Sequence, residues 1–196
     1  MDHSRVEAFT DAVVAIIMTI MVLEFKTPES PKLTAILADV PYLFAYLVSF
    51  LFIGVAWYNH HYMFALAKRI SKRVYWVNNF WLLTMSLLPV ATAWAGEYLA
   101  ERGPEFFYLV VFFAWSVAYW LLTRALIADH RGTTVAVQLA KMPPYRFMNS
   151  WQLPTFTLVL AVAVYFYPPA CLIATLIELI YMALHTNADS DRVVAE

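Results

Sequence analysis

Several ionisable and amide side chains stand inside long apolar runs of this sequence. The first run begins with Arg5 and Asp11, and a later run carries Asn59, His60 and His61. Ionisable groups are costly within an apolar helix, so where they occur they usually mark a function or an internal pairing. Two kinds of chemistry are open to them: transfer of ions or protons, and hydrogen bonding that holds helices together.

Metal binding and enzymatic catalysis receive little support. His60 and His61 are adjacent, so on a helix they point about 100° apart, and no HExxH or carboxylate pattern accompanies them. The single cysteine, Cys171, has no nucleophile-activating base at a suitable spacing. We therefore expect no metal ligand set, no cofactor and no enzymatic activity.

The composition indicates that these groups lie in a membrane protein. Of the 196 residues, 62% are hydrophobic and 14% are charged, and the mean hydropathy is +0.63. A water-soluble domain carries about 25% charged residues. The aromatic share of 17% also fits a membrane protein, because Trp and Tyr favour the headgroup region. A net charge of −1 provides no basic field for nucleic acid.

Clusters of charge and proline divide the chain into six apolar segments. A transmembrane helix needs about 20 mostly apolar residues. The sequence therefore predicts an all-α, multi-pass membrane protein with one domain over residues 1–196. Its helices are expected at about 6–25, 41–67, 74–95, 105–127, 150–167 and 169–184. Pro168 and Pro169 predict a tight hairpin between the last two helices.

Lysine and arginine are concentrated in two of the predicted connections. These residues are Lys68, Arg69, Lys72 and Arg73 in one connection, and Arg131, Lys141 and Arg146 in the other. Short cytoplasmic loops carry the excess of Lys and Arg in membrane proteins. We therefore expect a cell-membrane protein with both termini in the cytoplasm.

The first predicted helix has an apolar stripe along one face. At about 100° per residue, Ile16, Ile20 and Leu23 fall within about 40° of one line, and Phe9 and Val13 continue it. By periodicity alone, such a stripe is typical of a core-facing or lipid-facing surface. Enclosing a pore is a further possibility that periodicity does not decide.

Asp11 lies about 140° from that stripe, so its carboxylate is expected to point into the helices of its own subunit. There it needs partners. The candidates for one buried network with Asp11 are Arg5, Trp57, Asn59, His60, His61 and Asn78. This network either locks three helices together or coordinates an ion, and we expect the structural role.

Two motifs in these segments resemble the transmembrane-protein-175 potassium-channel family. The first is Arg-x-x-x-Phe-Ser/Thr-Asp, which here comprises Arg5, Phe9, Thr10 and Asp11, and the second is the Trp-x-x-His-His of residues 57–61. Thr10 stands where Ser is commoner, but it keeps the hydroxyl. The resemblance covers the first three helices by motif and all six by number and orientation.

The resemblance implies a potassium channel without a TVGYG filter, built as a homotetramer whose first helices line a central pore in the bilayer. Motif alignment puts the constriction at Ile16, Ile20 and Leu23, with a threonine layer at Thr19. Rings of apolar side chains can gate by dewetting, with potassium as the permeating ion. Glu24, near the outer mouth, either concentrates cations or is an interfacial carboxylate bonded to a neighbour.

A proton- or cation-coupled secondary transporter is the main alternative. The features that suggest it are a possible helix break at Pro154 and the polar groups Asp11, His60, His61, Gln152 and Glu178. The two halves of the chain show no common motif, which counts against a transporter built from repeats. A structural assembly protein is a third possibility and would conduct no ions.

Overall fold

The structure, a computed structural model, describes residues 2–28, 30–67 and 69–185, so Lys68 lies outside the described residues. The chain forms α1 (His3–Ile20), η1 (Met21–Glu24), η2 (Leu33–Asp39), α2 (Val40–Leu66), α3 (Lys72–Met85), α4 (Leu88–Glu97), α5 (Arg102–Asp129), α6 (Thr134–Lys141), α7 (Pro143–Met148), α8 (Gln152–Phe166) and α9 (Ala170–His185), where η denotes a 3₁₀ helix. The described ranges contain no strand, which confirms the all-α prediction.

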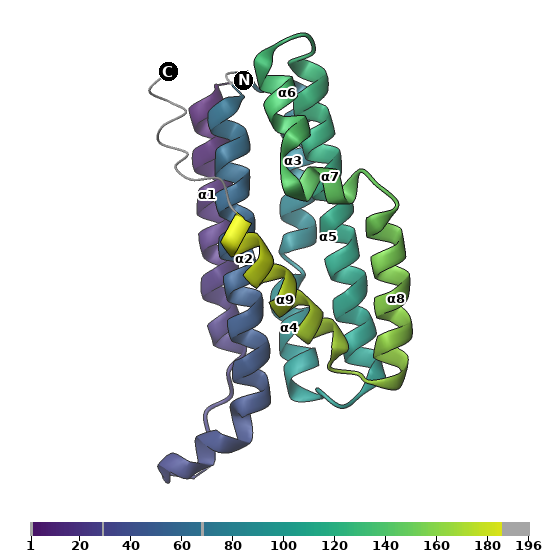
Figure 1. The fold of residues 1–196 in the computed structure, drawn as a ribbon. Helices are drawn as coiled ribbons and strands as arrows, with labels where there is room; N and C mark the ends of the chain where they lie inside the picture. The colour runs from purple at the N-terminus through teal and green to yellow at the C-terminus, as the bar shows by residue number, and fades with distance from the viewer. Residues whose placement is uncertain (1, 29, 68, 186–196) are drawn as a thin grey trace.

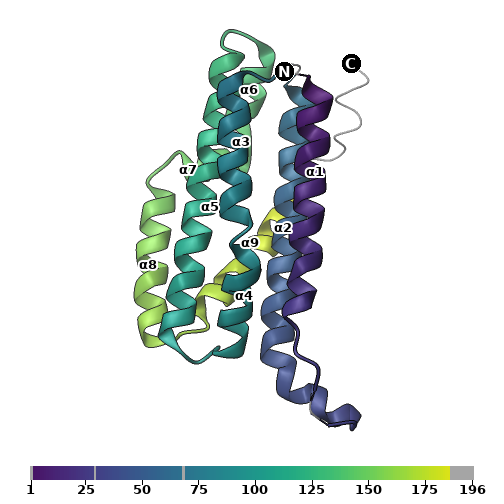
Figure 2. The same cartoon turned by 180° about the vertical axis from the view of Figure 1, so that it is seen from behind.

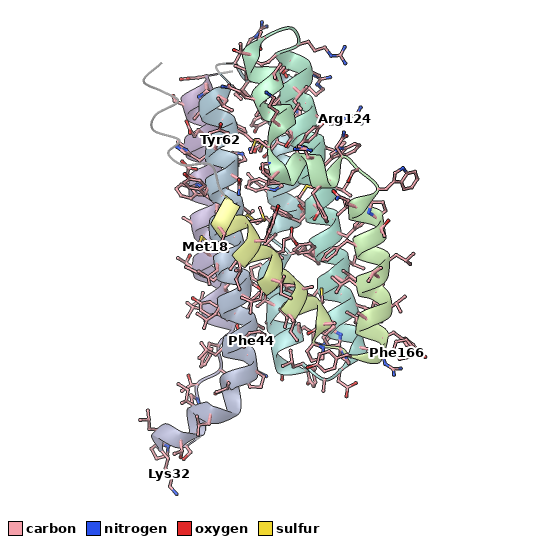
Figure 3. All side chains as sticks on the ribbon, viewed as in Figure 1. Met18, Lys32, Phe44, Tyr62, Arg124 and Phe166 are labelled. Atoms are coloured by element: carbon pink, nitrogen blue, oxygen red, sulfur yellow. The ribbon has the colours of Figure 1, made fainter. Side chains whose placement is uncertain are left out.

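The long helices form an elongated bundle in which α2 and α5 are central. Helix α2 packs against α1, α4 and α9, whereas α5 packs against α3, α4 and α8. Helix α1 lies at one edge of the bundle beside α2, and α9 crosses the bundle diagonally (Figures 1 and 2). Lys32 lies at the tip of the segment that projects beyond the end of the bundle (Figure 3).

Three helices are long and apolar enough to cross a membrane: His3–Glu24, Val40–Leu66 and Arg102–Asp129. Residues 152–166 and 170–182 form shorter apolar helices. The other three of the six predicted spans therefore stay a prediction.

The segment predicted as one helix over residues 74–95 consists instead of two helices, α3 and α4, separated at Ser86 and Leu87. Pro89 explains the break, because it stands in the first turn of α4. A proline has no N–H to donate and its ring clashes with the preceding turn, so it breaks or kinks a helix interior but fits the first turn of a helix. Pro154 likewise lies in the first turn of α8 and does not break that helix, contrary to the suggestion from sequence.

The predicted connection between residues 128 and 149 also contains the short helices α6 and α7. The side chain of Thr133 caps α6 by accepting a hydrogen bond from the Ala136 N–H. Two prolines, Pro143 and Pro144, open α7. These local signals favour short helices, although the segment is too rich in charge to read as a span.

Aromatic side chains form the centre of the core between α2, α3 and α5. Phe52, Trp81, Trp115 and Tyr119 are all buried. The rings of Phe52 and Trp115 lie 4.6 Å apart between centroids, edge to face. This packing joins α2 and α3, the two helices on which the buried face of α1 rests, to α5.

Helices α2 and α4 approach closely at Gly96. A Cβ atom at this position would lie 2.8 Å from the Tyr42 Cα atom and 3.2 Å from the Ala45 Cβ atom. Only glycine therefore fits there without a shift of one helix. Because α2 also carries α1, this contact helps set the position of the first helix.

Candidate functional site

Helix α1 has one packed face and one open face. Its buried side chains are Val6, Thr10, Val14 and Ile17, spaced so that they share one side of the helix. This side packs against α2 and α3. The stripe residues Phe9, Ile16 and Ile20 are exposed in the single chain, as is Leu23 in the following η1, whereas Val13 is half-buried.

Thr19 lies beside this stripe and is also exposed. Its hydroxyl donates within its own helix, at 2.9 Å from the Ile16 carbonyl oxygen and 3.0 Å from that of Ala15. A hydroxyl that donates its proton inward keeps its oxygen lone pairs free as acceptors. The oxygen of Thr19 can thus accept from water or contact a cation at the open face.

On the packed face, three buried polar side chains connect α1, α3 and α2. The Asn78 amide nitrogen donates to the Thr10 hydroxyl oxygen at 2.8 Å, and the Asn78 oxygen lies 2.8 Å from His60 Nε2. Thr10 in turn donates to the Val6 carbonyl oxygen. Because the Asn78 oxygen is an acceptor, His60 Nε2 must carry the proton in this arrangement.

Aromatic rings hold His60 in place from both sides. Its ring lies 4.7 Å from the Trp81 ring at 9° and 4.1 Å from the Phe64 ring at 26°. All three side chains are fully buried. The imidazole is therefore fixed as a donor toward Asn78.

A second set of polar contacts ties α1 to α2 where the side chains are more open. Trp57 Nε1 donates to the Asp11 carboxylate at 2.8 Å. The ring nitrogen Nδ1 of His61 lies 3.1 Å from a Glu7 carboxylate oxygen. Sequence reasoning did not select Glu7, although it precedes Asp11 by four residues and so shares its side of the helix.

Two residues of the predicted polar network around Asp11 do not take part in these contacts. Arg5 is exposed and, among the described residues, its guanidinium makes no hydrogen bond or ion pair, so Trp57 takes the place expected for it at Asp11. Asn59 donates to the carbonyl oxygen of Val55 in its own helix and lines a cavity beside α7 and α9. The reason is helix geometry: with His60 directed at α3, its neighbour points about 100° away.

The far end of α1 leads to an acidic cleft of about 500 Å³. The charged residues that line it are Glu24, Lys26, Asp39, Glu97 and Glu101. Lys26 Nζ lies 2.7 Å from Glu97 Oε1, and this hydrogen bond, with the charge of Glu97, raises the pKa of the Lys26 ammonium. No hydrogen bond or ion pair to Glu24 occurs within the described ranges, so its charge is not neutralised there.

Comparison with known proteins shows that the chain is similar to one protein family. The family model described as "Endosomal/lysosomal potassium channel TMEM175" matches residues 5–89, which include both motifs. A protein named as a potassium channel from Chamaesiphon minutus (strain ATCC 27169 / PCC 6605) is 30% identical over 205 residues, covering 95% of this chain and 96% of that protein. The chain belongs to the TMEM175 family. The resemblance predicted from residues 5–11 and 57–61 is confirmed.

Two further relatives extend the comparison. The crystal structure of a lysosomal potassium-selective channel TMEM175 homologue from Chamaesiphon minutus is similar in fold, with a TM-score of 0.78 and 29% identity over 95% of this chain and 98% of that one. A protein named as a potassium channel from Chryseobacterium sp. (strain P1-3) is 37% identical over 127 residues, which span 65% of this chain and just under two thirds, 66%, of the relative. With its apolar helices, this TMEM175 family member is a membrane protein.

Proposed function

We propose that this chain is a potassium-permeable monovalent cation channel, formed by four copies around a pore that α1 lines. The observation that carries the proposal is the stripe of Ile16, Ile20 and Leu23, which stays exposed while another face of α1, roughly 100° around the helix, is packed. One stripe cannot enclose a path, but symmetric copies can. The names of the potassium-channel relatives support the choice of ion.

The proposed barrier is hydrophobic. Four copies of each stripe residue form rings of alkyl groups, and a narrow alkyl ring excludes water until it widens. The sequence contains no TVGYG segment. Selectivity then comes from the lower dehydration cost of potassium compared with sodium, helped by the acceptor oxygen of Thr19 near the rings.

The polar contacts behind α1 supply the support that such a pore helix needs. The hydrogen bond that Asn78 donates to Thr10 and the one that it accepts from His60 tie α1 to α3 and α2 on the packed face of α1. Hydrogen bonds are directional, so these buried contacts fix the register of the three helices more narrowly than apolar packing does. We assign these residues to holding the pore helix and not to contacting ions.

The proposed orientation puts both termini in the cytoplasm and the acidic cleft outside the cell membrane. His3 and Glu24 mark the two ends of the first span. The unneutralised Glu24 would raise the local cation concentration at the outer mouth, because surface charge acts over about one Debye length, roughly 10 Å at 0.1 M salt.

Flux from liposomes that contain the purified protein tests this function. A channel should pass potassium faster than sodium, exclude N-methyl-glucamine, and show no stoichiometric counter-ion, with a tetrameric mass in detergent. Flux coupled to a proton gradient would favour the transporter instead. A conducting monomer or dimer would refute the symmetric pore.

A further inference from the structure

A cavity of about 700 Å³ lies away from the stripe, between α7, α8, α9 and one side of α2. Figure 1 shows α7 and α9 on the same side of the bundle. Apolar residues that include Met142, Phe147, Met148 and Phe156 form much of the wall. This volume is in the range of small-molecule sites, about 300–1,000 Å³, and such sites combine apolar walls with a few polar groups.

Two opposite charges line this apolar cavity. In Glu178, the oxygen Oε2 is buried and has no hydrogen-bond partner within the described chain. Arg146 is exposed, and its guanidinium makes no hydrogen bond or ion pair to the described residues. Burying a carboxylate oxygen without a hydrogen-bond donor is unfavourable. A ligand that brings an N–H donor to this oxygen would therefore be stabilised.

The cavity is also reachable from the surface of the bundle. Ile177 lines it and is 63% exposed in the single chain. Ile177 lies on α9, one of the shorter apolar helices, so this opening is bordered by apolar surface. The occupant is therefore expected to be amphipathic, with an apolar part at the opening and charged groups inside.

We propose that this cavity binds the headgroup of a phospholipid that carries a primary ammonium, such as phosphatidylethanolamine. Glu178 accepts from the ammonium, the guanidinium of Arg146 holds the phosphate, and the apolar walls cover the upper part of the acyl chains. A choline headgroup has no N–H to donate, and a glycerol headgroup has no cation for Glu178. The site should therefore rank ethanolamine above choline and glycerol headgroups.

Native mass spectrometry of the purified full chain, with dioleoyl lipids of the three headgroups added in turn, tests this ranking independently of ion flux. We expect ethanolamine lipid to bind about tenfold more tightly than the other two, the effect of one charge-assisted hydrogen bond. Glu178→Gln should remove this preference, and Arg146→Gln should weaken all three phospholipids. Equal binding of the three lipids to the unaltered protein would overturn the proposal, whether or not the variants fold.

Glu105→Gln is the matched control. Glu105 is also a buried carboxylate with neither oxygen hydrogen-bonded to a described side chain, but it does not line this cavity. The variant should keep the ethanolamine preference, and its loss there would contradict the assignment to Glu178. A long-chain alkylamine, which has no phosphate, can also be added to displace the bound lipid. If it displaces the lipid equally well from the Arg146→Gln variant and from the unaltered protein, then Arg146 does not hold a phosphate. That result would also overturn the proposal.

Discussion

The side chains of Ile16 and Ile17 are neighbours in sequence but lie on different faces of α1, with 56% and 4% of their surfaces exposed. Ile17 packs with Val14 and Met21 in the core. Ile16 belongs to the open stripe with Ile20 and Leu23. A polar substitution at these two positions should therefore have two different consequences.

Ile16→Asn should raise resting conduction. It puts four amides at a level where four alkyl groups exclude water in the proposed pore, so the dewetting barrier should fall. Liposome flux, normalised to the amount of assembled protein, measures the change.

Ile17→Asn is the control for this experiment. It buries an amide among apolar side chains and should reduce the yield of folded protein without wetting the pore. Reduced or unchanged flux in Ile16→Asn, or a larger rise in Ile17→Asn, would mean that another face of α1 lines the path.

Asn78→Ala should destabilise the assembly. The change leaves both the Thr10 hydroxyl and His60 Nε2 without their buried partner, at a cost of about 1–3 kcal/mol. Thermal unfolding in detergent measures the loss. Asn79→Ala is the matched control, because Asn79 is only half-buried and donates to the Tyr75 carbonyl oxygen of its own helix. Equal effects of the two changes would show that Asn78 does not connect the helices.

Trp57→Phe should weaken the attachment of α1 to α2 by removing the N–H that Asp11 accepts. The expected loss is about 1 kcal/mol, since the pair is partly exposed. Asp11→Ala should give a similar loss, and the double variant should add little more. Arg5→Ala should stay within about 0.5 kcal/mol, as is usual for an exposed side chain without a partner. The measurement is unfolding in detergent beside flux: a changed potassium-to-sodium preference in folded Asp11→Ala would instead place Asp11 in contact with ions.

Gly96→Ala should destabilise the packing of α4 on α2. The new methyl group would meet the Tyr42 backbone, and overpacking of this kind costs about 1–3 kcal/mol. Gly54→Ala is the control, since a Cβ atom there meets only the end of the flexible Met18 side chain at 4.0 Å. Because alanine favours helices by about 1 kcal/mol over glycine, Gly54→Ala should be neutral or stabilising. A stable Gly96→Ala protein would show that α2 and α4 can separate without loss.

Local properties of the sequence determined that the chain is a helical membrane protein and which residues share each face of α1. The apolar runs are long enough for a bilayer, and a period of 3.6 residues assigns Ile16 and Ile17 to different sides whatever the helix packs against. The family could also be predicted, because its motifs are contiguous: residues 5–11 and 57–61 both lie in the matched segment. The break between α3 and α4 could also be predicted from Pro89, although the hydropathy is continuous across it.

Only the tertiary structure decided which side chains meet. Spacing predicts the face on which Asp11 lies, but its partner, Trp57 and not Arg5, depends on how α2 is rotated and shifted against α1. The same rotation turns Asn59 away from His60 and Asn78 and into a cavity with Glu178. Helix periodicity is a property of each segment alone, whereas these pairings depend on the angles and offsets between segments, which are set by packing across the whole bundle.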